Sequence, residues 1–168
     1  MPKLKLKGPV VGATVYNNGD LVAKDVAITL PAVTSLTYDF TAGGTTTLPV
    51  TGLTEAMEAS ITKIGEDLGL LSLIQPGSLD LEVRWAQESV DNDGNKTVEG
   101  CRAYLKSHCK ELPGISLAVG EGSENALTFA VTRYELIVNG KQFLLVDKLK
   151  GIHKINGKDY MKSISSLL

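Results

Sequence analysis

The stretch from Glu99 to Glu111 constrains the fold more than any other part of the chain. Its side chains alternate between small or apolar and polar types. Because successive side chains of a strand point to opposite faces, this pattern predicts a half-buried strand of about 13 residues, more than twice the usual length. The two faces carry Cys101, Ala103, Leu105, Ser107 and Cys109 on one side and Arg102, Tyr104, Lys106, His108 and Lys110 on the other. Long strands build walls rather than pockets, which favours a structural, self-assembling protein.

Composition and charge narrow the class of protein further. A chain of 168 residues has the size of one domain, and it can bury about 70% of its extended-chain surface, so we expect a single domain over residues 1–168. Its 17 glycines, its many threonines and valines, and only 5% aromatic residues favour a mainly β fold. The net charge of −2 argues against a broad nucleic-acid-binding surface.

The sequence carries no signal for a membrane or for export. No apolar run approaches the roughly 20 residues of a membrane span, and residues 1–10 lack the apolar stretch and cleavage site of a signal peptide. We therefore expect a protein that is made in the cytosol and is not inserted into a membrane.

The two cysteines are predicted to be free thiols. Cys101 and Cys109 lie on one predicted strand, which separates them by roughly 26 Å at about 3.3 Å per residue. A disulfide requires Cα atoms within about 7 Å. A metal site that includes His108 is rejected as well, because His108 points to the opposite face and no CxxC spacing exists. We predict no metal and no cofactor.

No residues stand out as catalytic. Nucleophilic catalysis needs a positioned base, and the only histidines are His108, on a polar strand face, and His153, which has no acid near it in sequence. Asp80 and Glu82 share a strand face, but Arg84 continues the row, which indicates ordinary charge pairing. The chain is predicted not to be an enzyme.

Asn-Gly pairs predict tight β-hairpin turns, because this dipeptide readily takes positive φ at both central positions. Asn18-Gly19 joins predicted strands 13–16 and 21–30, and Asn139-Gly140 joins 126–138 and 142–149, while Asn156-Gly157 repeats the signal. A clean alternation over 79–90 predicts another strand, which reaches the long strand through a turn at 91–95. That turn is not read as a calcium loop, because Gly100 stands where an EF-hand needs a Glu. A short helix is predicted from about Asp159.

Three other segments either fit two different structures or are predicted to contact a partner. Residues 1–10, with Lys3, Lys5 and Lys7, are either a frayed terminus or an arm that pairs with a neighbouring subunit. Residues 41–52 are predicted to form an extended loop that contacts a partner. The stretch from Thr54 to Gly65 fits a helix and a strand equally, and the leucine-rich stretch from Glu66 to Ile74 predicts a helix.

Several stretches follow one another in an order that is typical of one family. They are Gly12 to Pro31 with its NNG turn and terminal ITLP, Ala42-Gly43-Gly44, GLTEAMEA at 52–59, Tyr104-Leu105-Lys106 leading to ELPG at 111–114, Tyr134-Glu135-Leu136 with Val138-Asn139-Gly140, and INGKD at 155–159. In this order the chain resembles the major tail tube protein of contractile-tailed phages and R-type bacteriocins. The differences lie mainly between Glu82 and Val98, where this chain carries its own hairpin and tip.

The resemblance implies a mainly β fold: a two-sheet antiparallel β-sandwich or barrel with one flanking α-helix and long hairpins shared between subunits. It implies that 53–62 is a strand and that the helix begins near Gly65. It also implies six copies per ring, with rings stacked into a hollow tube. Strands that continue into a neighbour's sheet would remove the exposed edges that drive aggregation.

The function implied is that of a non-enzymatic inner tube, a conduit for DNA or ions in a virion tail or phage-tail-like particle assembled in the bacterial host cytoplasm. The implied partners are sheath, baseplate and tail terminator proteins. The expected subunit-interface residues are Lys3, Lys5, Lys7, Ala42, Gly43, Gly44, Thr45, Glu55, Met57 and Glu58. The polar strand face from Arg102 to Lys110 is expected to border the lumen or the outer surface. The alternative is a monomeric β-sandwich binding module that uses the 41–52 loop.

Overall fold

The computed structural model describes residues 5–168, and its regular structure is almost entirely β. The strands are β1 (Leu6–Asn17), β2 (Asp20–Lys24), β3 (Ala27–Thr29), β4 (Ser35–Thr41), β5 (Thr45–Thr54), β6 (Met57–Ile64), β7 (Leu79–Val90), β8 (Lys96–Glu111), β9 (Glu124–Val138), β10 (Lys141–Asp147), β11 (Ile152–Ile155) and β12 (Lys158–Asp159). Two one-turn helices, α1 (Leu68–Leu71) and α2 (Lys162–Ser165), accompany them. The predicted mainly β class is confirmed.

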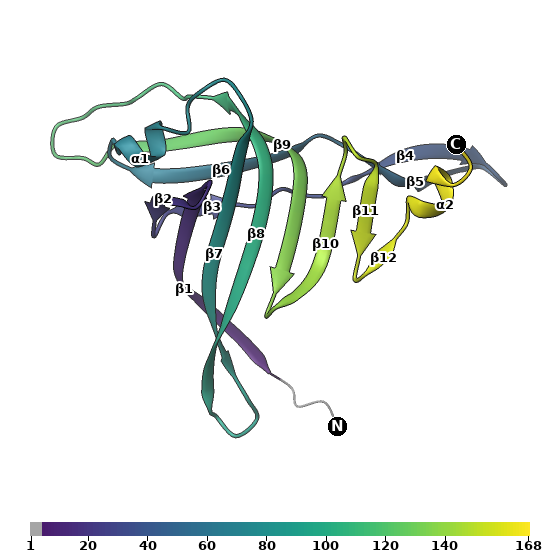
Figure 1. Cartoon of the computed structure of the whole chain (residues 1–168), viewed down its shortest axis with the longest axis horizontal. Coiled ribbons are helices and arrows are strands. Elements are labelled where there is room, and N and C mark those ends of the chain that lie inside the picture. The colour runs from purple at the N-terminus through teal and green to yellow at the C-terminus, as the bar shows by residue number, and fades with distance from the viewer. Residues whose placement is uncertain (1–4) are drawn as a thin grey trace.

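The strands form two antiparallel sheets. The larger has the order β12-β11-β10-β9-β8-β7-β1-β2, with β6 and β3 attached through β9, and the smaller is the isolated pair β4–β5. The strand β9 belongs to two layers, because Glu124–Val131 pairs with β6 while the stretch from Thr128 to Val138 pairs with β8. Figure 1 shows β6 crossing the upper ends of the long strands. The predicted two-sheet antiparallel architecture is confirmed.

The hydrophobic core lies between the long strands and β6. On β7, Leu79, Leu81 and Val83 are buried, and their β8 partners Leu105 and Ala103 are buried opposite Leu81 and Val83. The β6 residues Met57, Ala59 and Ile61 close the same cluster from the other layer. The strand β8 has 16 residues, longer than predicted, and the predicted inner face from Cys101 to Ser107 is buried. The period-two pattern therefore identified the core face correctly.

The predicted Asn-Gly turns are confirmed. Asn18, Asn139 and Asn156 have φ of 51°, 49° and 50°, and each is followed by a glycine with φ between 78° and 88°. Positive φ at both central positions gives the backbone twist that matches two adjoining antiparallel strands. The tip between β7 and β8 is organised by the Asp91 carboxylate, which accepts hydrogen bonds from the backbone N–H groups of Asp93 and Asn95, each at 2.9 Å.

The N-terminal segment is part of the sheet rather than a free arm. From Leu6 onward it belongs to β1 and pairs with β7 of the same chain, with Leu6 opposite Val90 and Lys7 opposite Ser89. The reading as a frayed terminus is wrong for residues 6–10, because the long β7–β8 hairpin offers them an edge within the chain. The reading as an arm that pairs with a neighbouring subunit remains a prediction. Lys3 lies outside the described residues.

The predicted extended loop at 41–52 is wrong. Residues 45–54 form β5, which pairs with β4 along most of its length, and only the short turn around Gly43 and Gly44 is irregular. The glycines of this segment suggest a loop, but its threonines are β-branched and therefore favour a strand. Figure 1 shows this β4–β5 hairpin projecting from the body at the right-hand end.

The ambiguous segment after Thr54 is a strand. The strand β6 runs from Met57, and Gly65 ends it with φ of 86°. The predicted helix between Glu66 and Ile74 exists only as the single turn α1, capped by the Asp67 carboxylate on the Gly69 N–H at 2.9 Å. The strand reading implied by the family resemblance is confirmed from Met57 onward, whereas Leu53 and Thr54 end β5.

The helices are too short to dominate any layer. The helix α1 packs on the core through Leu70, whereas α2 matches the short C-terminal helix expected after Asp159 and buries no residue. In residues 5–168 we find no helix with the length and apolar character to cross a membrane.

Gly52 fixes how the β4–β5 hairpin meets the body. It lies in an irregular stretch of β5 with φ of 76°, and a Cβ there would lie 2.0 Å from the Met161 Sδ. Replacing Gly52 with Ala should therefore lower the free energy of unfolding by about 1–3 kcal/mol, mainly from backbone strain, because the Met161 side chain can move. Urea unfolding of the two proteins measures this difference in the free energy of unfolding. Gly114→Ala, where nothing lies within 4 Å of the added Cβ, is the matched control, and an equal loss in both variants would contradict this explanation.

Candidate assembly surfaces

The N-terminal half of β1 is an open strand edge. The strand β2 pairs with β1 only from Thr14 to Asn17, whereas β7 pairs with β1 from Leu6 onward. Within the described chain, residues 6–12 therefore have a strand on one side only, and Leu6, Val10 and Val11 beside this edge are exposed. Unpaired backbone groups beside apolar side chains are a template for another strand.

Two of the predicted interface lysines have a partner in their own chain. Lys7 donates to the Glu99 carboxylate, and Lys5 lies 3.7 Å from it. Glu99 is buried, with 6% of its surface exposed. The hydrogen bond from Lys7, followed by the positive charge of both lysines, holds the pKa of Glu99 below its usual range. Lys5 and Lys7 thus fasten the start of β1 to β8, and a contact with a neighbour remains a prediction.

The ion pairs of Glu99 with Lys5 and Lys7 should make the stability of the folded chain depend on pH. Because the pKa of Glu99 is lower in the folded chain than its ordinary value of about 4.3, its contribution is complete above that value and is lost as the pH falls through the folded pKa. Glu99→Gln should therefore lower the urea midpoint at pH 7, and the difference from the unmodified chain should shrink at pH 3. A difference that stays constant between the two pH values would contradict this role.

The β4–β5 hairpin is the second open surface. The strand β4 pairs only with β5, so both outer edges of this hairpin lack a strand partner among the described residues. Leu36, Tyr38 and Phe40 are exposed and alternate along β4, and the rings of Tyr38 and Phe40 lie 4.9 Å apart, edge to face. The Glu55 N–H bonds the Thr34 carbonyl at 2.8 Å and closes the base of the hairpin. An apolar two-stranded ribbon of this kind is marginally stable alone.

The expected interface residues divide into two groups in the structure. Ala42, Gly43, Gly44 and Thr45 form the exposed tip of the β4–β5 hairpin. The prediction that Met57 contacts a neighbour is wrong, because Met57 is 2% exposed and packs in the core of its own chain. The alternation of β6 explains this: Met57 points inward, and Glu58 points outward.

The two glutamates near the start of β6 have different surroundings. Glu58 is exposed and forms an ion pair with Lys110 of β8. Glu55 is exposed, and its backbone carbonyl accepts a hydrogen bond from the Lys148 side chain at 2.7 Å. Both residues stay exposed despite these contacts, the Glu58 side chain to 46%, so both remain predicted interface positions.

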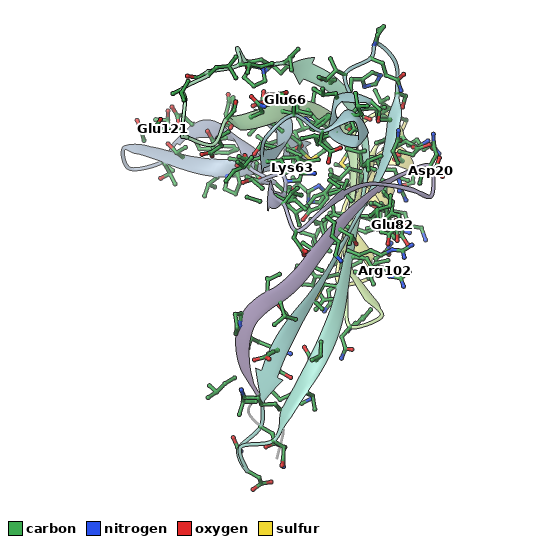
Figure 2. The ribbon with its side chains drawn as sticks, turned by 90° about the vertical axis from the view of Figure 1, so that its left-hand side faces the viewer. Asp20, Lys63, Glu66, Glu82, Arg102 and Glu121 are labelled. Atoms are coloured by element: carbon green, nitrogen blue, oxygen red, sulfur yellow. The ribbon has the colours of Figure 1, made fainter. Side chains whose placement is uncertain are left out.

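The predicted polar face of β8 is open along its length. Arg102, Lys106, His108 and Lys110 are exposed and Tyr104 is half-buried. Figure 2 shows Glu82 and Arg102 on the same side of the long strands, in agreement with the 4.0 Å distance between their charged groups. This face therefore lies on the outside of the folded chain, opposite the core.

Most carboxylates on this face are paired. Glu82 accepts from Arg84 at 2.6 Å, and this bond lowers the pKa of Glu82 and raises that of Arg84. The Arg84 guanidinium also lies 4.3 Å from the centre of the Tyr16 ring. On β9, Arg133 bonds Glu135 at 3.0 Å and lies 3.8 Å from Asp147. The predicted charge pairing of Glu82 with Arg84 is confirmed, and the face is a mixed, internally compensated network.

The residues considered for catalysis or metal binding are scattered. His108 is exposed on β8, whereas His153 is buried on β11 with its ring 6.4 Å from that of Tyr160. Cys101 and Cys109 are free thiols. Across residues 5–168, no group of three or more His, Cys, Asp and Glu side chains is arranged to hold a metal ion. The open surfaces of this chain are therefore unpaired strand edges beside exposed apolar side chains, on β1 and on the β4–β5 hairpin. Such surfaces are suited to assembly with another chain.

Comparison with known proteins decides the family. Residues 9–168 match the family model described as phage tail tube protein FII. The chain belongs to this family. No curated protein sequence matched it. The match covers all the stretches on which the sequence resemblance depends, from Gly12 to Asp159.

Two solved structures of extracellular contractile injection systems share the fold of this tail tube family member. One is a chain of a PVC sheath–tube complex in the extended state, with a TM-score of 0.56 and 12% identity, covering 78% of this chain and 91% of that chain. The other is a chain of a PVC sheath/tube terminator in the extended state, with a TM-score of 0.55 and 12% identity, covering 77% and 95%. At this identity the likeness concerns the fold.

Sequence reasoning missed two apolar surfaces of this tail tube protein. The first is an open groove of about 330 Å³ between β1, β3 and β7, lined by Val10, Val26, Ile28, Val83 and Trp85 among others. The second is the segment after β8, where Ile115, Leu117 and Val119 are exposed. A usable signal for the second existed, because these three residues alternate and no charged residue stands between Glu111 and Glu121.

Proposed function

We propose that this chain is the repeating subunit of the inner tube of a contractile phage tail or a related particle such as an R-type bacteriocin. The match of residues 9–168 to the phage tail tube family carries this proposal. The open edges of β1 and of the β4–β5 hairpin support it, because a subunit that must join sister copies needs surfaces that are incomplete alone.

Identical copies close a ring of six, and the rings stack into a tube. A head-to-tail contact between two different surfaces of the subunit gives a ring when its rotation closes. Closure converts the open edges into shared sheets, so the hairpins are shared between subunits and exposed edges are lost. Contacts that hold such a wall permanently belong to the obligate class, which buries about 2,000 Å² or more.

The polar face of β7, β8 and β9 suits the lining or the outer surface of a conduit. Its carboxylates are compensated by Arg84 and Arg133, and Arg102, Lys106 and His108 remain exposed. A face of this kind holds water and makes no base-specific contact, so DNA or ions pass without being retained. The role is structural and involves no catalysis.

The partners proposed are sheath, tail terminator and baseplate proteins. Solved chains with this fold come from a sheath–tube complex and from a sheath/tube terminator. The subunit is assembled in the bacterial host cytoplasm and works in the finished particle, where a contracting sheath drives the tube through a target envelope.

Electron microscopy and size exclusion of the purified chain test this function. We expect rings and hollow tubes of uniform diameter, and material that elutes far ahead of a 17.9 kDa monomer. A persistent monomer at high concentration, with no rings or tubes, would instead favour the monomeric binding module with residues 41–52 as its contact surface.

A further inference from the structure

The segment between β8 and β9 has the properties of a strand without a partner. Residues 112–123 form a loop in which Ile115, Leu117 and Val119 alternate along the chain. All three are exposed, Leu117 to 80%, and none of residues 112–120 is charged, although 21% of the whole chain is charged. Within the described chain no strand pairs with this segment. An uncharged, exposed, alternating segment is an aggregation hazard unless something covers it.

The return of this loop is anchored, which holds the segment in place. The Gly65 N–H donates to the Ser123 carbonyl at 2.6 Å. Gly122 lies against Ile64, where an added Cβ would be 2.8 Å from the Ile64 Cγ2. Figure 2 places Glu121, just beyond the apolar stretch, at an outer edge of the molecule. The apolar residues therefore project from a fixed base rather than folding back on the body.

The outer edge of β4 is the best match for this segment within the chain's own surfaces. It presents Leu36, Tyr38 and Phe40 on one face, in the same alternation as the loop. The other edge of the hairpin belongs to β5, which is blunted by Pro49 because proline has no N–H to donate. The two segments also match in charge: the single carboxylate of β4, Asp39, alternates to the opposite face and accepts from the Thr47 hydroxyl at 2.5 Å.

These two surfaces lie at opposite ends of the subunit. In Figure 1 the green loop before β9 reaches the left-hand end of the longest axis, and the tip of β4–β5 reaches the right-hand end. One copy cannot join its own two ends, but a row of copies can join the left end of each to the right end of the next. Such a head-to-tail contact is the kind that closes rings.

We propose that residues 115–119 of one copy add as a strand to the outer edge of β4 of the next copy. This inference rests on the proposed function and names the partner of both surfaces as a second copy of this chain. Strand addition satisfies the free backbone groups of β4, while Ile115, Leu117 and Val119 pack beside Leu36, Tyr38 and Phe40. The contact is small, so it sets the pairing of neighbours within a larger interface.

Disulfide trapping tests the pairing directly. Tyr38→Cys is combined in turn with Ile115→Cys, Leu117→Cys or Val119→Cys. Because same-face neighbours on a strand are about 7 Å apart, one of the three lies within disulfide reach of residue 38. After assembly and mild oxidation, at least one double variant should give a ladder of linked multimers on a non-reducing denaturing gel. The single variants, which share Cys101 and Cys109, should stay monomeric. No ladder from any assembled double variant, or a ladder from a single variant, overturns the pairing.

A charge variant separates this inference from the proposed function. Leu117→Lys should lower the yield of rings and tubes at least tenfold with an unchanged thermal midpoint, whereas Leu149→Lys, equally exposed at 81%, should assemble normally. If the unmodified chain forms tubes and Leu117→Lys does too, this inference fails while the tube function stands. Tubes of Leu117→Lys that no longer bind a sheath protein would assign the loop to that partner and overturn the pairing of copies. If the unmodified chain does not assemble, both the tube function and the pairing of residues 115–119 with β4 are wrong.

Discussion

Replacing Phe40 with Asp should abolish ring and tube formation while leaving the subunit folded. Phe40 is half exposed near the tip of the β4–β5 hairpin, and the centre of its ring lies 4.9 Å from that of Tyr38. A carboxylate at this position would be removed from water without a partner on assembly. Interface hot spots cost about 2–4 kcal/mol when truncated, so the dissociation constant between subunits should rise about 30- to 1,000-fold.

Sedimentation velocity over a concentration series measures this effect. The circular dichroism spectrum and thermal midpoint of monomeric Phe40→Asp should match those of the unmodified monomer, because the substituted side chain is not in the core. Leu149→Asp is the matched control, since Leu149 is an exposed apolar residue on the β10–β11 turn. Normal tubes from Phe40→Asp would exclude the β4–β5 hairpin from the assembly contacts.

Phe129→Ala should cause the largest loss of stability in the chain. Phe129 is fully buried on β9, opposite Ala59 of β6 and Cys109 of β8, so its ring fills the space where the two layers share one strand. Removing a buried aromatic ring loses its burial and leaves a cavity, which together lower the free energy of unfolding by about 3–5 kcal/mol. Urea unfolding of the monomer gives this value directly.

Phe143→Ala is the matched control for that experiment. Phe143 lies on β10 and is 49% exposed, so its removal should cost less than about 1.5 kcal/mol. Similar losses in the two variants would show that β9 is not the centre of the core.

The long strands could be predicted because their signals are local. The alternation of Leu79, Leu81 and Val83 against charged neighbours specifies a strand, its period and its buried face without any knowledge of the partner strand. The Asn-Gly turns are local in the same sense, since the backbone preference of two residues decides the geometry.

The wrong predictions concern segments whose pairing strand is distant in the sequence, and one residue, Met57, whose motif fits both a buried and an exposed position. Residues 45–54 look like a loop in composition, and only pairing with β4 makes them a strand. Residues 6–10 look like a frayed terminus because the β7–β8 hairpin that pairs with them lies some 80 residues further along the chain. Met57 was expected at an interface from a family motif, but a motif does not state which face of β6 is buried.

The candidate site was only partly predictable. The polar face of β8 and the exposed hairpin tip at Ala42 to Thr45 could be named from the sequence. The apolar stripe of β4 and the segment from Ile115 to Val119 have no catalytic or binding motif, and apolar residues normally indicate a core. The exposure of the β4 stripe is known only from the three-dimensional arrangement, whereas the segment from Ile115 to Val119 carries a local signal, because three apolar residues alternate there with no charge between Glu111 and Glu121.

Hydrogen exchange before and after assembly tests most directly whether sister copies complete the open strand edges. The amides of β4 that point away from β5, and those of residues 6–12 that point away from β7, should exchange quickly in the monomer and slowly in tubes. Tubes in which both sets of amides exchange as quickly as in the monomer would contradict the account, because the wall would then be held together without using these edges.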